Sequence, residues 1–273
     1  MKMNNPLYLR KHQYADPQNL NARILIHSHF SIGTESWADF IFRHFAIEGS
    51  MNILALGCGN ATQWQINQDR FPPDTRITLT DLSMGMIHPA PPSLLKDHRF
   101  SFLCCDIQQT PFLDRYFDRV TANHMLYHVP DILTGLKEVS RVIKPEGIFM
   151  AATNGETHMI DLYELLEAFE PAYHPDDAKH TRFSIENGFE ILKQVFSEVK
   201  FKTYESNLWV TDAQLLVDYV YSMWDAEEVI PDASRGEMNQ YFQNMIDTDG
   251  GIFIRKSTGI FLASQSSKII NSI

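Results

Sequence analysis

Residues 54–59, Leu-Ala-Leu-Gly-Cys-Gly, form the stretch that decides how this chain folds. An apolar run over residues 52–56 stops at two glycines that flank Cys58, which predicts a buried strand followed by a tight turn. Glycine permits positive φ, and without a side chain it lets a ligand approach the backbone amides of the turn. The stretch therefore predicts a strand that ends in a ligand-binding turn.

Further short apolar runs follow over residues 77–80, 100–105, 117–122 and 148–152. An amphipathic segment at residues 132–143 predicts a helix before the last of these strands. Strands that alternate with helices pair in parallel through right-handed crossovers. We therefore expect an α/β fold with a doubly wound, mostly parallel sheet.

A glycine or a polar residue follows each predicted strand. These residues are Gly57, Asp81, Asp106, Asn123 and Asn154. In an open parallel sheet, ligands bind outside the carboxyl ends of the strands. Because all of these residues would gather at one edge of the sheet, we expect the binding site there.

The spacing of these residues discriminates between cofactors. A dinucleotide fingerprint needs a third glycine where this chain has Thr62, so a pyrophosphate cradle is disfavoured. Asp81 lies about 20 residues further on, where an acidic residue binds ribose hydroxyls. Asp106 can accept a hydrogen bond from an exocyclic amine, and Ile107 and Met86 can cover the faces of a purine. Ribose and adenine without a pyrophosphate indicate S-adenosylmethionine.

Each of these residues also has a simpler role. A glycine pair after a strand is a common turn, and Asp81 can cap the helix that follows it. Asp106 is equally suited to a turn. The prediction of a cofactor site therefore depends on the ordered set and not on any one member of it.

Three later motifs extend the pattern: Thr-Asp-Leu-Ser at 80–83, Cys-Asp-Ile at 105–107 and Arg-Val-Ile-Lys-Pro-Glu-Gly at 141–147. Together with residues 54–59 they resemble class I S-adenosylmethionine-dependent methyltransferases, in the small-molecule branch that includes the ubiquinone and menaquinone biosynthesis type. The resemblance implies a Rossmann-like sheet of seven strands with N-terminal helices and a helical cap. Its last strand, over 253–263, would be antiparallel and would pair with a neighbour at 199–210.

The same resemblance implies which residues bind the cofactor. Gly57 and Gly59 would line the methionine part, Asp81 would hold the ribose, and Asn123 would close the pocket below the sulfonium. An N-terminal lid, which this branch often uses, would place Tyr14 over the cofactor. The full predicted set is Tyr14, Gly57, Cys58, Gly59, Asp81, Leu82, Met86, Asp106, Ile107 and Asn123.

Two positions depart from the family pattern. Ala55 stands where the family usually has an acidic residue, and Ala61 stands where it often has glycine. The missing carboxylate removes an indirect anchor for the methionine ammonium. Either cofactor affinity is weaker for this loss, or a neighbouring acid such as Glu35 or Asp39 substitutes for the missing carboxylate.

The acceptor side is less clearly marked. His124 follows the fourth strand, where the methyl group would be presented, and an imidazole there can hydrogen-bond the acceptor or act as a general base. His128 comes one helical turn later, but no third ligand is spaced to join the pair, so we expect no metal site.

Further acceptor-side candidates come from the two insertions and the N-terminus. The acids of residues 161–170 most simply form a solvated face, although one of them, Glu170, would be a second catalytic candidate if it pointed into the pocket. The candidate substrate residues are Tyr8, His128, His158 and Trp224, and the cations to consider for an anionic acceptor are Arg23, Arg182 and Arg255.

The domain organisation follows from these placements. Residues 1–49 are predicted to form a helical lid and residues 50–155 the cofactor-binding core. Residues 156–210 would complete the core with a helical insertion, 211–251 would form a helical cap, and 252–273 the final strand and tail. The aromatic residues of the cap are also explained more simply as its own hydrophobic core.

Composition limits the partners. The 273 residues carry 23 Lys and Arg against 34 Asp and Glu, a formal charge of −11, which disfavours nucleic acid as a partner. No apolar run approaches the roughly 20 residues of a spanning helix, so we expect no membrane span. Three cysteines make no disulfide framework, which favours a cytoplasmic protein. The sequence leaves room for a homo-oligomer.

The sequence thus predicts an enzyme that transfers the methyl group of S-adenosylmethionine to an O, N or C atom of a small, largely apolar metabolite and releases S-adenosylhomocysteine. Two alternatives stay open: a non-catalytic regulatory protein that binds the same cofactor, and an NAD-dependent oxidoreductase.

Overall fold

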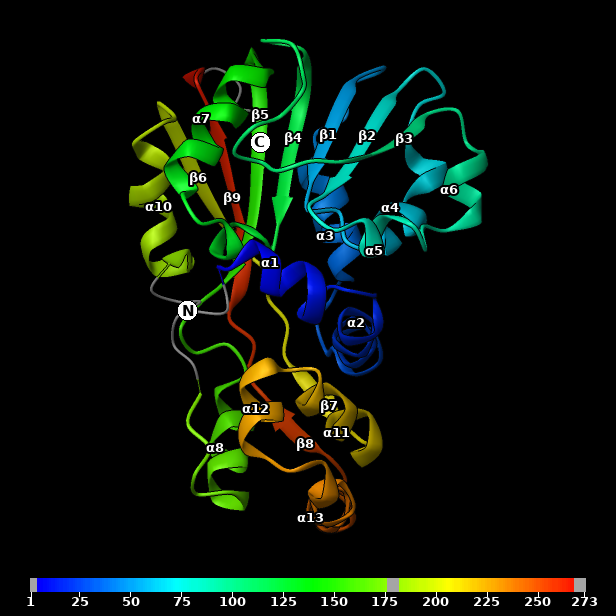
Figure 1. Cartoon of the computed structure of the whole chain (residues 1–273), viewed down its shortest axis with the longest axis vertical. Helices are drawn as coiled ribbons and strands as arrows, with labels where there is room; N and C mark the ends of the chain where they lie inside the picture. Colours follow the sequence, from blue (N-terminus) through cyan, green and yellow to red (C-terminus); the bar gives the residue numbers. More distant parts are fainter. Residues whose placement is uncertain (1–3, 176–181, 268–273) are drawn as a thin grey trace.

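A seven-stranded sheet forms the upper part of the molecule in Figure 1. The computed structural model describes residues 4–175 and 182–267, without the side chains of Trp224 and Glu227. The strands of the main sheet are β1 (Asn52–Leu56), β2 (Arg76–Asp81), β3 (Phe100–Cys104), β4 (Phe117–Asn123), β5 (Ile143–Asn154), β6 (Glu198–Thr203) and β9 (Thr258–Ser264).

The strands lie in the order β3-β2-β1-β4-β5-β9-β6. Strands β1 to β5 pair in parallel, whereas β9 is antiparallel to both β5 and β6. The prediction of a mostly parallel sheet with an antiparallel last strand is confirmed. Because β1 lies between β2 and β4, the chain changes direction across the sheet there, and the glycine turn opens at this switch point.

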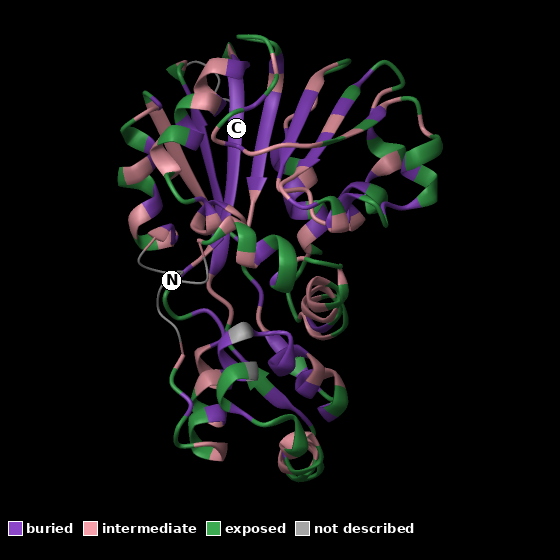
Figure 2. Ribbon diagram, viewed as in Figure 1, coloured by how far each residue is buried: buried purple, intermediate pink, exposed green. Residues whose placement is uncertain are grey.

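Helices cover both faces of the sheet, as Figure 2 shows by the buried strands between them. Ile53 and Ala55 pack into one hydrophobic cluster with helices α3, α4 and α6, while Leu54 and Leu56 pack into another with α7 and α10. A strand buried on both faces must be apolar throughout, which is why residues 52–56 carry so clear a signal. The helices and short turns of this layer are α3 (Trp37–His44), α4 (Thr62–Ile66), η2 (Gln68–Arg70), α5 (Met84–Ile87), α6 (Pro92–Lys96), η3 (Leu126–His128), α7 (Ile132–Val142) and α10 (Ile185–Lys193).

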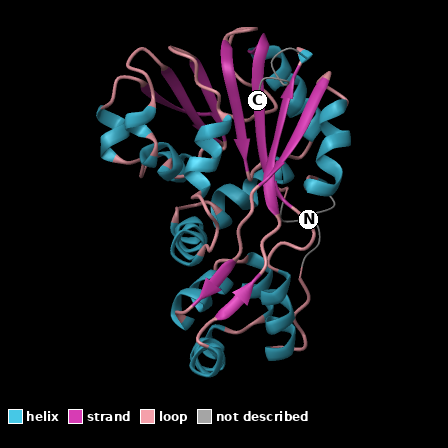
Figure 3. Cartoon of the chain, turned by 180° about the vertical axis from the view of Figure 1, so that it is seen from behind, coloured by secondary structure: helices cyan, strands magenta, loops and turns pink. Residues whose placement is uncertain are grey.

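A second lobe lies below the sheet and has its own hydrophobic core (Figures 1 and 3). Its core includes Leu162, Leu216 and Phe242, all fully buried. We call this lobe the cap. Its elements are α8 (Ile160–Phe169), β7 (Leu208–Val210), α11 (Ala213–Tyr221), α12 (Trp224–Val229), η4 (Asp232–Ser234), α13 (Arg235–Asp249) and β8 (Ile252–Ile254).

The cap corrects two strand predictions. The predicted strands 199–210 and 253–263 are each broken in two, because residues 204–207 and 255–257 carry the chain out of the main sheet. The outer halves, β7 and β8, pair with each other as a separate two-stranded sheet. The cap therefore includes α8, β7 and β8 in addition to the predicted helical segment 211–251.

The N-terminal segment lies between the sheet and the cap (Figure 1). It consists of α1 (Pro6–Tyr8), the π-helical turn η1 (Leu9–Gln13) and α2 (Gln18–Phe30). Asn60 Nδ2, in the glycine turn, donates a hydrogen bond to Asn21 Oδ1 at 2.6 Å, and Arg23 donates to Ser222 in the cap. Helix α2 thus contacts both lobes.

Across residues 4–175 and 182–267, no helix is both long and apolar enough to cross a lipid bilayer.

Candidate active site

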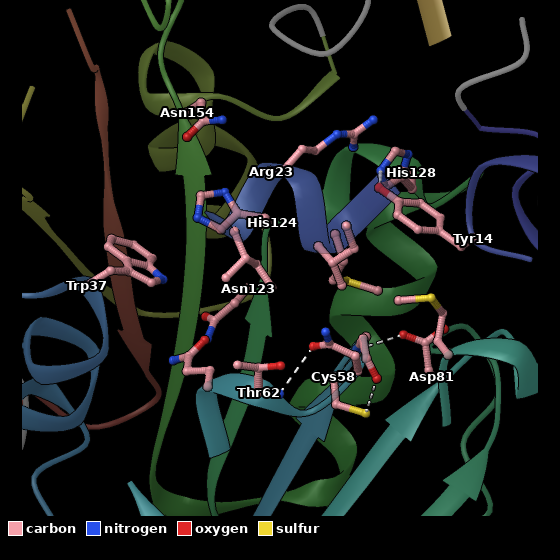
Figure 4. A pocket seen from close by; sticks show the side chains of 18 of the residues that line it. Tyr14, Arg23, Trp37, Cys58, Thr62, Asp81, Asn123, His124, His128 and Asn154 are labelled. Carbon is pink, nitrogen blue, oxygen red and sulfur yellow. Dashed lines mark hydrogen bonds between the residues drawn. The ribbon is translucent and has the colours of Figure 1, made fainter. Parts of the chain in front are cut away.

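A cavity of about 800 Å³ lies where the carboxyl ends of the parallel strands meet α2 and the cap. Its volume is toward the upper end of the range for small-molecule pockets. Figure 4 shows the cavity wall, with Cys58 and Asp81 on one side and Trp37, His124 and Asn154 on the other.

The glycine turn at the end of β1 requires both of its glycines. Gly57 and Gly59 have φ values of +67° and +58°, in the left-handed region that side chains rarely adopt. A Cβ on Gly57 would lie 2.8 Å from Met125 Cγ, and one on Gly59 would lie 2.8 Å from Leu20 Cδ2. The turn therefore has no room for a side chain at either glycine, and both glycines line the cavity.

Asp81 stabilises this turn from the end of β2. Its Oδ2 accepts a hydrogen bond from Gly59 N at 3.0 Å, and its Oδ1 accepts one from Ser83 N at 2.9 Å. Each carboxylate oxygen keeps a second lone pair for a ligand hydroxyl. Burial raises the pKa of Asp81, and the amides of Ser83 and Gly59 oppose that shift.

Asp81 and Asp106 line the same cavity, as the sequence predicted. Asp106 Oδ1 already accepts a hydrogen bond from Gln108 N at 2.8 Å, and its Oδ2 accepts from Gln108 Nε2 at 3.1 Å. Gln108 therefore fixes the carboxylate. The buried side chains of Met86 and Ile107 line the same cavity.

The dinucleotide alternative meets an obstacle in the same turn. Asn60 Oδ1 accepts a hydrogen bond from Thr62 N at 3.2 Å, so the side chain of the turn caps an amide that a pyrophosphate would need. Helix α4, which follows, is only five residues long. The turn suits a ligand that contacts glycine backbone without a phosphate.

Asn123 and His124 continue the wall at the end of β4. Asn123 Nδ2 donates to Gln63 Oε1 at 3.4 Å, but Asn123 Oδ1 is buried without a partner among the described residues. An orphaned acceptor that lines a cavity suits a ligand that carries hydrogen-bond donors.

His124 has a φ of +54°, a strained conformation that holds its imidazole 5.3 Å from the Trp37 ring. Burial, aided by the charge of Lys256, lowers the pKa of His124 to about 4. The imidazole is therefore neutral at pH 7 and able to accept a hydrogen bond.

Neither proposed substitute for the acid missing at Ala55 is free to take its place. Glu35 lines the cavity, but its Oε1 lies 2.6 Å from Arg43 NH2. Asp39 binds Arg70 at 2.7 Å and is not among the residues that line the cavity.

The N-terminal segment closes one side of the cavity. Tyr8 and Tyr14 both line it, and Tyr14 OH hydrogen-bonds His128 Nε2 at 3.0 Å. Ser83 Oγ donates to the Tyr14 carbonyl at 2.8 Å. A Cβ on Gly85 would lie 1.9 Å from the carbonyl oxygen of Ala15, so the segment packs directly on the loop after β2.

The structure brings together most of the residues that the sequence singled out. All ten predicted cofactor residues line the cavity, as do the candidates Tyr8, His124, His128 and His158. Glu170 is not brought there: it ends α8, where its Oε1 accepts a hydrogen bond from Ala172 N at 3.2 Å. The side chain of Trp224 lies outside the described part of the structure.

The candidate cations behave differently from one another. Arg23 lines the cavity but donates to Ser222 Oγ at 3.2 Å. Arg182 donates to the carbonyl of Tyr127, and Arg255 pairs with Asp161 at 2.7 Å; neither lines the cavity.

Sequence reasoning missed several residues of the cavity wall, because each is isolated in its own segment and belongs to no motif. They are His27, Tyr204, Tyr219 and Lys256. Among residues 4–175 and 182–267, no three potential metal ligands gather at one point.

The mostly parallel seven-stranded sheet, with its glycine turn at the switch point, is the fold of S-adenosylmethionine-dependent methyltransferases. Residues 54–151 match the family described as methyltransferase domain, which places the match on β1 to β5, where the cofactor residues lie.

Individual relatives are similar to parts of this chain. Over 127 residues the chain is 32% identical to the biotin biosynthesis bifunctional protein BioHC of Saccharophagus degradans, covering 46% of this chain and 22% of that protein. Over 180 residues it is 23% identical to the demethylmenaquinone methyltransferase of Geobacillus stearothermophilus, covering 65% of this chain and 68% of that protein.

A solved structure of Haemonchus contortus phosphoethanolamine N-methyltransferase 2, in complex with phosphomonomethylethanolamine and S-adenosylhomocysteine, shares the fold. Its TM-score is 0.59 at 16% identity, and the alignment covers 97% of this chain and 60% of that one.

Proposed function

We propose that this chain transfers the methyl group of S-adenosylmethionine to a small, largely apolar acceptor held between the sheet and the cap. One observation carries the proposal. The glycine turn with Asp81 and the aromatic wall of Trp37, Tyr204 and Tyr219 line one continuous cavity. A cofactor and an acceptor bound there would therefore share one enclosed space.

The residues at the cofactor end suit S-adenosylmethionine part by part. The backbone at Gly57 and Gly59 would bind the methionine portion. The carboxylate oxygens of Asp81 would accept hydrogen bonds from the ribose hydroxyls. Asp106 and Ile107 would take the adenine, with Met86 and Leu82 beside it. Tyr14 would cover this end, and Asn123 would lie below the sulfonium.

When bound, S-adenosylmethionine supplies an activated methyl group, so catalysis depends chiefly on positioning. His124 is the candidate for orienting the acceptor. With a pKa of about 4, its imidazole accepts a hydrogen bond at neutral pH but is a weak base. We therefore assign it hydrogen-bond acceptance from the acceptor rather than full proton removal.

The surroundings favour a small acceptor over a polymer. The cavity is bordered by residues of α2 and of the cap, and the chain carries a formal charge of −11. An acidic protein has little electrostatic attraction for nucleic acid.

The test is incubation of the protein with S-adenosylmethionine labelled on its methyl group and a metabolite extract. We expect label in a small organic product and equal formation of S-adenosylhomocysteine. A regulatory protein would bind the cofactor and release no labelled product, and an oxidoreductase would bind NADH in preference to S-adenosylmethionine.

The variant His124→Ala refines this test. We expect it to lower turnover at least about fivefold while cofactor affinity changes little, since one lost hydrogen bond is worth about 1 kcal/mol or more. His98→Ala is the matched control, because His98 is 87% exposed. Equal losses of turnover and cofactor affinity in His124→Ala would show that the residue is structural.

A further inference from the structure

Lys256 places an ammonium group at the end of the cavity that the cofactor residues do not reach. It lies in the linker between β8 and β9, where the chain passes from the cap back to the main sheet. Its Nζ donates to Ser31 Oγ at 3.1 Å and to Ser206 Oγ at 3.2 Å, and it lies 4.9 Å from the centre of the Tyr204 ring. Contacts to two separate segments, the end of α2 and the linker 204–207, fix the charge in position.

This ammonium has no anionic partner in the described part of the chain, where none of the ion pairs includes Lys256. The carboxylates that share the cavity are engaged elsewhere. Glu35 pairs with Arg43, and Asp225 Oδ1 accepts from Ala226 N at 3.1 Å. Asp81 and Asp106 lie at the cofactor end. A lysine withdrawn from bulk water is seldom left without a counter-charge.

Three histidines lie at the same end of the cavity, and none of them supplies a negative charge to pair with Lys256. The ring of His27 lies 5.9 Å from that of His158, and His27 Nδ1 is buried without a partner among the described residues. His158 Nδ1 accepts a hydrogen bond from Ser257 N at 3.3 Å, which leaves the proton of a neutral ring on Nε2. Burial and the charge of Lys256 lower the pKa of His27 to about 3 and that of His124 to about 4. The site therefore carries one positive charge among neutral polar groups.

A chain of ring contacts connects this end to the point of methyl transfer. Trp37 lies 5.3 Å from the His124 ring and 5.1 Å from the Tyr204 ring, and Tyr204 contacts Lys256. A group bound at Lys256 would thus belong to the acceptor and would lie beyond its reacting atom, against an aromatic wall.

We propose, resting on the proposed function, that Lys256 with Ser31 and Ser206 forms a subsite for an anionic oxygen group of the acceptor. The acceptor is then an acid with an otherwise apolar body. Its anion takes the ammonium as counter-charge and its apolar part lies along Trp37 and Tyr204.

Simple anions test the subsite without knowledge of the natural acceptor. The protein is saturated with S-adenosylhomocysteine, and binding of benzoate, phenyl phosphate and the neutral isostere benzamide is measured by calorimetry. We expect at least one anion to bind about tenfold or more tightly than benzamide, since hydrogen bonds to charged groups contribute about 1.5–3 kcal/mol. Benzoate and phenyl phosphate distinguish a carboxylate from a phosphate ester.

Substitutions of Lys256 test whether this residue causes the preference for anions over benzamide. Lys256→Met should reduce the ratio of anion to benzamide affinity to near one and leave S-adenosylhomocysteine affinity within about twofold. Lys96→Met, at an exposed lysine of α6, removes the same charge and should keep the ratio. Lys256→Arg keeps a cation and should retain part of the preference.

Several results would overturn the proposal. If the wild type binds benzamide as tightly as it binds both anions, the subsite does not exist. This conclusion holds even if Lys256→Met fails to fold. If Lys256→Met folds and keeps the ratio, Lys256 is only a structural link between α2 and the cap. If the wild type does not bind S-adenosylhomocysteine, the result contradicts the proposed function itself rather than the subsite.

Discussion

The two ends of the cavity are built in different ways. At the cofactor end, a short glycine turn shapes the wall: Gly57 and Gly59 adopt left-handed backbone, and the carboxylate of Asp81, from the neighbouring strand, accepts a hydrogen bond from its amide. At the acceptor end the wall consists of side chains from segments far apart, such as His27, Tyr204 and Lys256. A short run of sequence can specify a backbone turn, but only the finished fold can bring such side chains together. Experiments that separate the two ends therefore test the whole interpretation.

The largest effect is expected where backbone conformation defines the cofactor end. Gly57→Ala places a Cβ at φ +67° and 2.8 Å from Met125 Cγ. Left-handed backbone costs an L-residue about 1–2 kcal/mol and overpacking about 1–3 kcal/mol more. We expect the free energy of unfolding to fall by about 2–5 kcal/mol in urea titration, with cofactor affinity reduced at least about tenfold.

Gly250→Ala is the matched control. Gly250 ends α13 with φ +81°, but a Cβ there would meet nothing within 4 Å. It should incur only the backbone cost and leave cofactor affinity unchanged. Identical losses of stability in the two variants, with affinity intact in both, would contradict the view that the turn is shaped around a ligand.

A smaller effect is expected from the carboxylate that supports the turn. Asp81→Ala should weaken S-adenosylmethionine binding by about 1–3 kcal/mol, the cost of a lost charge-assisted hydrogen bond. Calorimetry measures it directly. Asp118→Ala provides the comparison, because Asp118 Oδ2 accepts from Asn52 N at 2.9 Å at the opposite end of β1. Each variant removes a carboxylate that accepts a hydrogen bond from a backbone amide at one end of β1. Only Asp81→Ala should change the affinity for S-adenosylmethionine. Unchanged affinity in Asp81→Ala would refute the ribose assignment.

The same contrast explains what the sequence could and could not predict. Strand β1 was predicted over its observed range, residues 52–56, because a strand buried on both faces is apolar along its buried length, here residues 53–56. The polar residues after the strands were found because parallel strands carry their carboxyl ends to one edge. The cofactor end of the site followed from these two local rules.

The cap resisted prediction for equally physical reasons. Arg255, Lys256 and Ser257 interrupt the apolar pattern between residues 252–254 and 258–263, but three polar residues do not by themselves show that the strand ends there and that its two halves join different sheets. Lys256 lies in this linker, so its place beside the cavity depends on a break in the strand that the sequence analysis did not predict. Glu170 illustrates the opposite error: an acid near a predicted pocket was considered catalytic, but the end of α8 turns it away from the cavity.

The smallest of the expected effects is a loss of stability at low pH, caused by a buried histidine at the acceptor end. His27 lines the cavity, and burial, Lys256 and His124 together lower its pKa from 6.5 to about 3. Above pH 6.5 the imidazole is neutral in both the folded and the unfolded chain, so its contribution to stability is constant. Below pH 6.5, His27 is protonated in the unfolded chain but stays neutral in the folded chain until about pH 3. The free energy of unfolding therefore falls as the pH falls.

The expected slope approaches about 1.4 kcal/mol per pH unit for this one group. Urea titrations between pH 7.5 and 5 on the wild type and on His27→Gln isolate it, because glutamine does not titrate and all other groups are shared. His124, His158, Lys256 and Tyr219 face the ring and remain in both proteins. The difference in unfolding free energy between wild type and variant should shrink as the pH falls below 6.5. Two parallel curves would mean that His27 titrates alike in both states, and the acceptor end would then be open to water rather than enclosed.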